Sequence, residues 1–152
     1  MIRLSETPFD PSEALEAFTQ SASGAGAIVS FTGLVRPTAN GDAVTSLRLE
    51  AYSPMTERGI ESAAREAQTR WPLTALNIIH RIGEMGPGDP IVFVATASAH
   101  RRAAFEAADY LMDYLKTEAI FWKKETSPTG SEWIEPRSED YADKARWAEK
   151  EG

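Results

Sequence analysis

Basic side chains gather at a few points of this 152-residue sequence where chemistry could be carried out. The sharpest is Ser98-Ala99-His100-Arg101-Arg102, where a predicted buried strand turns into a predicted helix. Free backbone N–H groups and the positive end of a helix dipole coincide there with three basic side chains, an arrangement that suits a phosphate. The alternative is a solvated first helical turn whose arginines pair with Glu106 or Asp109. Spacing alone leaves both interpretations open.

A second group of cations follows the same predicted helix at its other end. Lys116 closes the helix, and Lys123 and Lys124 lie on the next predicted strand beside two aromatic residues. Burial there would lower a lysine pKa toward use as a base or nucleophile, whereas the alternative is that the lysines meet the helix dipole or point to solvent. Because side chains alternate along a strand, Lys123 and Glu125 share one face and Lys124 takes the other. We therefore expect at most one of the paired lysines to enter a given pocket.

Two arginines stand apart from these groups. Arg36 ends a predicted strand next to a proline, and Arg137 follows the last predicted hairpin. A long cation at either point can reach across the mouth of a cleft, and a solvent-exposed arginine is the alternative. Taken together, the scattered cations are a weak indication of an anionic small-molecule ligand.

The composition limits the classes of function. Sixteen Lys and Arg against 23 Asp and Glu give a net charge of −7, which argues against a general nucleic-acid-binding protein. The sequence has no Cys, which removes disulfides, Cys-ligated metals, thiol nucleophiles and a sulfur-carrying role for this chain. With two histidines only, we expect no metal site and no resident cofactor. No apolar run has the length of a signal peptide or membrane span, and we expect a cytoplasmic protein.

The elements that must position these residues are strands interspersed with helices, which predicts an α+β fold. Helices are expected over residues 10–20 with Asp10 as N-cap, over 54–71, and over 98–118 with Ser98 as N-cap. Strands are expected over residues 27–32 and 47–52, paired as a hairpin, and over 76–82, 91–97, 120–125 and 132–135, the last two joined by a turn at 127–130. We expect one domain over residues 1–137 and a charged C-terminal tail over 138–152, frayed or loose from Tyr141 onward.

Ordered motifs run through most of the chain. The longest are Phe31-Thr32-Gly33-Leu34-Val35-Arg36, Ile79-His80-Arg81-Ile82-Gly83-Glu84, Met112-Asp113-Tyr114-Leu115-Lys116-Thr117 and Phe121-Trp122-Lys123-Lys124-Glu125. With these motifs the sequence resembles the large, catalytic subunit of molybdopterin synthase over nearly its whole length. The resemblance implies a hammerhead-like α/β layer with an additional antiparallel β subdomain, and dimerisation through this subunit.

The resemblance also implies an activity. Members of this family are sulfurtransferases that convert cyclic pyranopterin monophosphate (precursor Z) into molybdopterin by installing a dithiolene. The sulfur arrives on the C-terminal Gly-Gly thiocarboxylate of a small ubiquitin-like partner, within a heterotetramer built on a homodimer of the large subunit. The absence of Cys from this chain agrees with sulfur supplied by a partner. The alternative is a non-catalytic dimeric module that binds an anionic metabolite or a partner tail.

Residue roles follow from the same resemblance. It assigns catalysis to Lys116, as general acid/base or as the amine that captures the spent carboxyl, and to Lys123, which would stabilise the thiocarboxylate or developing oxyanions. Leu34 stands where relatives often carry a basic residue, so a contact there is expected through the backbone. The implied substrate-binding residues are Leu34, Val35, Arg36, His100, Arg101, Lys124, Glu125 and Arg137.

The length of the predicted third helix adds a geometric expectation. His100 and Lys116 are 16 positions apart, so a continuous helix would separate their backbones by roughly 24 Å at ~1.5 Å per residue. One small pterin cannot touch both ends. We therefore expect a composite site in which His100 and Arg101 of one chain approach Lys116 of a second copy.

Overall fold

The computed structural model describes residues 1–39, 41–135 and 137–148. Within these ranges no helix combines the length and apolar character needed to cross a membrane. The elements in chain order are β1 (Ile2–Ser5), α1 (Pro11–Ser21), β2 (Ala27–Leu34), β3 (Thr38–Ala39), β4 (Asp42–Ala43), β5 (Ser46–Ala51), α2 (Met55–Arg70), β6 (Leu73–Arg81), β7 (Gly83–Met85), β8 (Pro90–Ser98), α3 (Arg101–Thr117), β9 (Phe121–Ser127), β10 (Gly130–Ile134) and α4 (Ser138–Ala145).

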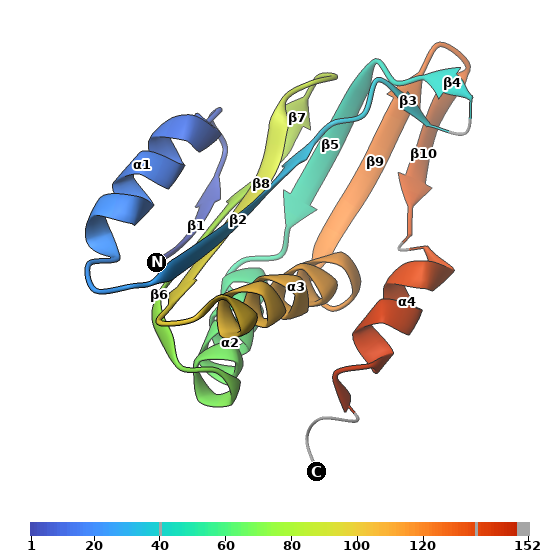
Figure 1. The fold of residues 1–152 in the computed structure, drawn as a ribbon. Helices are drawn as coiled ribbons and strands as arrows, with labels where there is room; N and C mark the ends of the chain where they lie inside the picture. The colour runs from blue at the N-terminus through green and yellow to red at the C-terminus, as the bar shows by residue number, and fades with distance from the viewer. Residues whose placement is uncertain (40, 136, 149–152) are drawn as a thin grey trace.

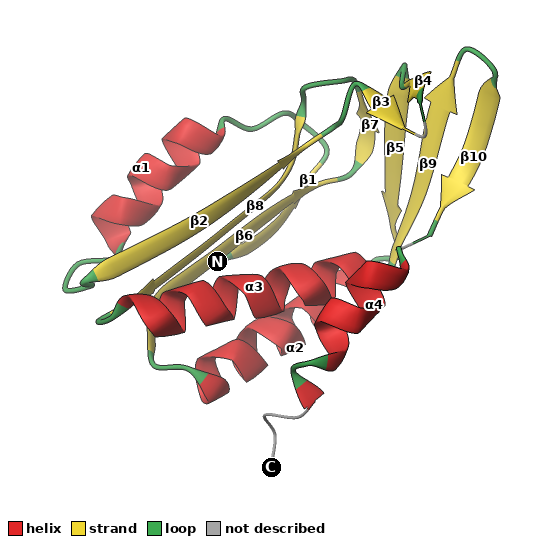
Figure 2. Ribbon diagram, turned by 45° about the vertical axis from the view of Figure 1, so that its right-hand side comes forward, coloured by secondary structure: helices red, strands yellow, loops and turns green. Residues whose placement is uncertain are grey.

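The first sheet has the strand order β1-β6-β8-β2. β1 runs parallel to β6, and the other pairs are antiparallel. Helix α1 lies on one face of this sheet, and α2 and α3 lie on the other (Figures 1 and 2). The apolar residues of the two central strands are buried almost throughout, as expected for strands covered on both faces.

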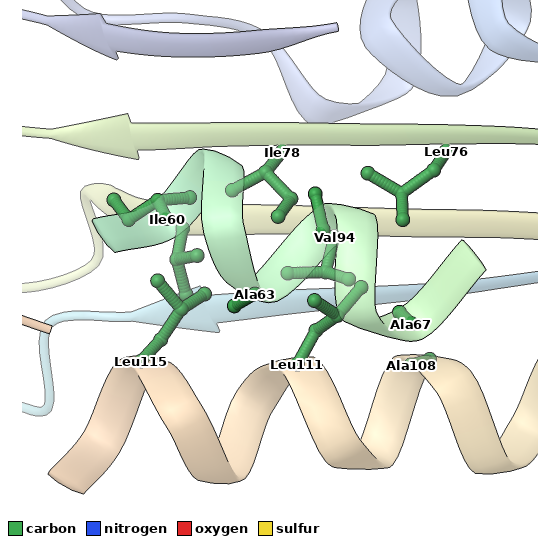
Figure 3. Close-up of a cluster of buried hydrophobic side chains, with 11 residues drawn as sticks. Ile60, Ala63, Ala67, Leu76, Ile78, Val94, Ala108, Leu111 and Leu115 are labelled. Carbon is green, nitrogen blue, oxygen red and sulfur yellow. The ribbon is translucent and has the colours of Figure 1, made fainter. Parts of the chain in front are cut away.

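The largest buried cluster lies between this sheet and the helices α2 and α3. Figure 3 shows Ile60 on α2 and Leu111 on α3 turned toward Ile78 and Val94 of the sheet. All four side chains are at most 1% exposed. Burying an aliphatic side chain of this size stabilises the fold by about 1.5–3 kcal/mol, so this layer is the main source of stability.

Helix α1 covers the opposite face of the sheet. The Asp10 carboxylate accepts a hydrogen bond from the Ser12 backbone N–H at 2.8 Å, which confirms the predicted N-cap. Phe18 is the buried anchor of the helix and packs with Phe93 of β8 in a second, smaller cluster. The first sheet is therefore covered by apolar contacts on both sides.

The second sheet is antiparallel, with the order β10-β9-β5-β7. Leu47 and Leu49 of β5 point inward and form a third buried cluster with Val35, Val44 and Met85. A short ribbon of β3 and β4 accompanies this sheet (Figure 2). A mixed sheet with helices and a separate antiparallel sheet confirm the predicted α+β fold.

Two local predictions were wrong. Residues 27–32 and 47–52 do not form a hairpin, because β2 pairs with β8 in the first sheet while β5 pairs with β9 and β7 in the second. The N-cap of α3 is His100 and not Ser98, whose hydroxyl instead donates a 2.9 Å hydrogen bond to the Pro72 carbonyl oxygen. In both cases a contact distant in the sequence prevailed over the local pattern.

The C-terminal residues are packed as far as the structure describes them. Helix α4 lies against α3 (Figure 1), and Trp147 is only 5% exposed. Its indole N–H donates to an Asp113 carboxylate oxygen at 2.6 Å, and Arg146 forms an ion pair with the same carboxylate at 3.0 Å. The expected loose structure from Tyr141 onward is therefore wrong for residues 141–148, because Trp147 anchors them. Residues 149–152 lie outside the described part, and the domain boundary at residue 137 stays a prediction.

Candidate functional site

A cavity of about 630 Å³ lies where the end of α3 and the end of β2 meet the inner face of the second sheet. β2 and the residues after it supply one wall from Phe31 to Arg36, and the last turn of α3 supplies another. Apolar side chains such as Leu47 and Leu49 form part of the lining. A cavity of this size accommodates a small-molecule ligand.

Four cationic side chains line this cavity, each from a different part of the chain. They are Arg36 after β2, Lys116 at the end of α3, Lys123 on β9 and Arg137 before α4. Three carboxylates share the lining, namely Glu125, Glu135 and Asp140. Convergent cations on an otherwise partly apolar cavity suit an anionic ligand, because the walls favour ion pairing over solvation.

Lys123 is a partly buried cation of this cavity. Burial lowers the pKa of Lys123 below its ordinary value, and the positive charges of Lys116 and Arg36 act in the same direction. The carboxylates of Glu125 and Asp140 oppose this shift without cancelling it. A bound anion would offset both the burial and the neighbouring positive charges, so this lysine is suited to stabilising negative charge in the cavity.

Asp140 closes one side of the cavity at the start of α4. Burial alone would raise its pKa, but hydrogen bonds from the Arg137 side chain and backbone, with the charges of Arg137 and Lys116, hold the pKa below its ordinary value. The Arg137 backbone N–H donates to Asp140 at 3.0 Å and the guanidinium at 3.3 Å. Asp140 is therefore an ionised carboxylate facing the lysines, and it holds Arg137 at the rim.

Most of the predicted site residues are brought together here. Lys123 and Glu125 line the cavity while Lys124 does not, which confirms the predicted alternation along β9. Lys124 points from the outer face of the sheet, where its ammonium lies 5.6 Å from the ring centroid of Trp133. The predicted site residues that line the cavity are Leu34, Val35, Arg36, Lys116, Lys123, Glu125 and Arg137.

His100 and Arg101 are not part of this cavity. They stand at the N-terminus of α3, and Lys116 stands at its C-terminus. The helix is continuous over Arg101–Thr117, so the expected backbone separation of roughly 24 Å holds within one chain. Both side chains are exposed, as the alternative of a solvated first turn predicts, although within the described ranges neither Arg101 nor Arg102 forms the ion pair to Glu106 or Asp109 that it also included.

Asp140, Tyr141 and His80 are among the lining residues that sequence reasoning missed. Asp140 and Tyr141 come from α4, whose docking depends on one tryptophan in a charged stretch. His80 lies near the end of the central strand β6 and was considered only as a possible metal ligand. Its alternation with Leu76 and Ile78 was the available signal, because it turns His80 toward the same side as the core.

An α+β fold with a cation-lined cavity beside its second sheet defines a protein that acts on an anionic small molecule. The family described as "MoaE protein" matches residues 4–118. The molybdopterin synthase catalytic subunit of Pseudomonas aeruginosa is 49% identical over 148 residues, which cover 97% of this chain and 99% of that protein. The chain therefore belongs to the MoaE family, and its function is that of a molybdopterin synthase catalytic subunit.

Solved structures agree with this assignment. The molybdopterin biosynthesis MoaE protein from Burkholderia ambifaria superposes with a TM-score of 0.82 at 43% identity, over 97% of each chain. A chain of the complex of subunits 1 and 2 of the molybdopterin-converting factor from Helicobacter pylori superposes with a TM-score of 0.76, over 90% of this chain and 92% of that chain. Its identity of 21% shows a shared fold alone.

Proposed function

We propose that this cavity transfers sulfur to cyclic pyranopterin monophosphate (precursor Z) from the C-terminal thiocarboxylate of a small ubiquitin-like partner, giving the dithiolene of molybdopterin. The observation that carries the proposal is the convergence of Lys116 and Lys123 on one cavity whose other cations suit an anionic substrate. The chain has no Cys, so the sulfur must come from outside it.

The two lysines have different surroundings and therefore different proposed roles. Lys123 is partly buried, and its charge stabilises the thiocarboxylate and the oxyanion that forms when water or the amine adds to the acyl carbon, before sulfur leaves. Lys116 is more exposed and acts as general acid/base, or as the amine that captures the acyl carbon. In either case the thiocarboxylate sulfur bonds to a side-chain carbon of the pterin as a carbon–oxygen bond at that carbon breaks and the oxygen leaves with a proton. The acyl–sulfur bond then breaks, sulfur stays on the pterin, and the acyl carbon ends on water oxygen or on the amine.

The substrate-binding roles divide between two copies of the chain. Leu34 and Val35 lie at one wall, Arg36 and Arg137 hold negative charge at the rim, and Glu125 lines the pocket beside Lys123. His100 and Arg101 bind the phosphate from the α3 N-terminus of a second copy, since a helix N-terminus and two cations favour an anion. Lys124, on the outer face, has at most a minor part.

The proposed assembly is a homodimer of this chain with one small partner at each end, in the cytoplasm. The Helicobacter pylori complex joins two different subunits of a molybdopterin-converting factor, which supports a two-subunit arrangement. The partner tail would enter as an extended strand ending in glycine, because only glycine allows close backbone approach in a narrow channel. One residue added after that glycine should remove activity while the subunits still bind.

The test is single-turnover conversion of precursor Z with a thiocarboxylated partner. Lys116→Ala should remove product formation while the fold and partner binding persist, because an exposed charge at a helix end adds little stability. Lys124→Ala is the matched control and should stay near wild type. Conversion by Lys116→Ala at the wild-type rate would remove Lys116 from the mechanism, and a wild-type protein that binds both ligands without reaction would favour a non-catalytic binding module.

A further inference from the structure

His80 is a buried side chain of the first sheet that also lines the cavity. It is 6% exposed and projects from β6 toward the site. Its ring stacks on Phe121 with a centroid distance of 4.2 Å and an interplanar angle of 19°. The backbone of β6 and the ring of Phe121 hold the imidazole in one orientation.

The position of the proton on this ring follows from one hydrogen bond. Nδ1 lies 2.9 Å from the Arg81 carbonyl oxygen. A carbonyl oxygen only accepts, so Nδ1 carries a hydrogen and donates it. In a neutral ring the other nitrogen, Nε2, is then an unprotonated acceptor. Nε2 is the ring nitrogen remote from the backbone, and it has no hydrogen-bond partner among the described residues.

The ring is neutral at physiological pH. Burial, together with the charges of Lys116 on α3 and Lys123 on β9, lowers the pKa of His80 to about 4, while the hydrogen bond to Arg81 acts in the opposite direction. Its cross-strand neighbours, Leu4 on β1 and Val92 on β8, carry no charge. A base this weak is a poor proton acceptor but remains a good hydrogen-bond acceptor for an ammonium group.

Lys116 is the donor that fits. It lines the same cavity as His80 from the last turn of α3, its side chain is exposed, and its ammonium has no hydrogen bond or ion pair within residues 1–39, 41–135 and 137–148. We propose that this side chain rotates within the cavity until its ammonium donates a hydrogen bond to Nε2 of His80, a bond that is not made in this structure, and that His80 thereby acts as the positioning residue that aims Lys116 at the reacting acyl carbon. This inference rests on the proposed role of Lys116.

The tautomer can be tested on the wild-type protein without substrate. Nitrogen NMR of histidine-labelled protein should show the Nδ1–H form for His80, with Nε2 unprotonated across pH 6–8. His100 serves as the internal comparison, because it is exposed at a helix N-terminus. An Nε2–H tautomer or a charged ring at pH 7 would overturn the proposal, whatever the fate of the sulfur-transfer mechanism.

Three substitutions separate positioning from structural support. His80→Phe keeps a ring to stack on Phe121 but has no acceptor, and it should lower the single-turnover rate about 10- to 100-fold with little change in KM, the effect of one lost charge-assisted hydrogen bond. His80→Gln places an amide oxygen near the Nε2 position and should recover most of the rate. His80→Asn reaches only the Nδ1 position and should stay slow.

Each outcome decides the proposal. A wild-type rate for His80→Phe, or equal rates for His80→Gln and His80→Asn, would overturn it. If His80→Phe fails to fold, the comparison between the Gln and Asn variants, made on folded protein with unchanged partner binding, carries the test alone. If Lys116→Ala proves fully active, the proposed lysine chemistry fails and the NMR result on His80 still stands as a separate finding.

Discussion

The two sheets of this fold use their inner faces in opposite ways. In the first sheet, β6 and β8 are buried between α1 on one side and α2 and α3 on the other, and most of their buried side chains are apolar. In the second sheet, β9 turns Lys123 and Glu125 inward beside the leucines of β5. The first sheet contributes most of the buried apolar surface, and we place the proposed chemistry at the inner face of the second sheet, with His80 of β6 at the boundary between the two.

This division has a physical cause. Partly buried charges cost free energy unless they are paired, and the pKa of Lys123 is lowered because the cavity does not fully compensate its charge. A single small sheet could not bear that cost alone. The first sheet and its three helices supply the burial that offsets it.

The largest expected effect is a difference in sulfur-transfer rate between variants on the two faces of β9. Lys123→Ala should slow single-turnover sulfur transfer by at least about 100-fold, as for other groups that stabilise a developing charge. Lys124→Ala, one position along and on the outer face, should stay within about threefold of wild type. Equal losses for the two variants, measured at matched partner saturation, would contradict the assignment of chemistry to the inner face.

The second prediction concerns the first sheet. Ile78 is 1% exposed in the main cluster, so Ile78→Ala should lower the free energy of unfolding by about 2–5 kcal/mol. Under conditions where this variant remains folded, its sulfur-transfer rate should be close to wild type. Urea denaturation measures the change in the free energy of unfolding, provided that its dependence on urea concentration is the same in both proteins. A rate loss as severe as that of Lys123→Ala would contradict the division of stability and proposed chemistry between the two sheets.

Much of the first sheet follows from the sequence, for a local reason. Helices α1, α2 and α3 have clear apolar periodicity, and β8 is a continuous apolar run, so each element was predicted to within a few residues. The partners of β2 and β5 were not predictable, because β2 pairs with β8 and β5 with β9, each more than 50 residues away, and the loop between β2 and β5 resembled a hairpin turn.

The site divides in the same way. Lys116, Lys123 and Glu125 follow from helix ends, strand alternation and family resemblance. The positions of His80 and Asp140 do not follow from the sequence. His80 lines the cavity because Phe121 of β9 packs against its ring, and Asp140 does so because α4 docks through Trp147. A single Trp in a charged C-terminal stretch gives no periodic pattern from which docking could be inferred.

A third prediction tests whether Trp147 anchors α4, the helix that carries Asp140 and Tyr141 to the cavity. Trp147→Ala should lower the stability of α4 docking by about 1–3 kcal/mol, because it removes a buried ring and leaves Asp113 without its indole donor. Hydrogen exchange of the α4 amides should accelerate while β6 and β8 stay protected. Arg146→Ala is the milder comparison, since its ion pairs are half exposed, and should cost less than about 1 kcal/mol. Equal exchange in wild type and Trp147→Ala would argue against this anchor.

The smallest expected effect is an increase in the free energy of unfolding. Lys123→Met should remove activity yet raise the free energy of unfolding by up to about 1 kcal/mol at neutral pH, because a partly buried charge beside Lys116 disappears. The folded protein holds the Lys123 proton less tightly than the unfolded chain does. In the wild type, the charged Lys123 side chain therefore destabilises the fold fully at pH values below its lowered pKa. This destabilisation disappears as the pH rises toward the ordinary pKa of 10.5. The stability gap between the variants should narrow over that range, and a gap that widens with pH would contradict the sign of the shift.

The central claim is that the lysine cavity of one chain is completed by the α3 N-terminus of another. Subunit exchange between Arg101→Ala and Lys116→Ala proteins, each inactive alone, tests it most directly. A mixed dimer holds one site with both residues intact and one with neither, so it should recover about half of the wild-type dimer activity. No recovery after exchange has been verified, for example by mass spectrometry of differently labelled chains, would contradict the claim and place each site within a single chain.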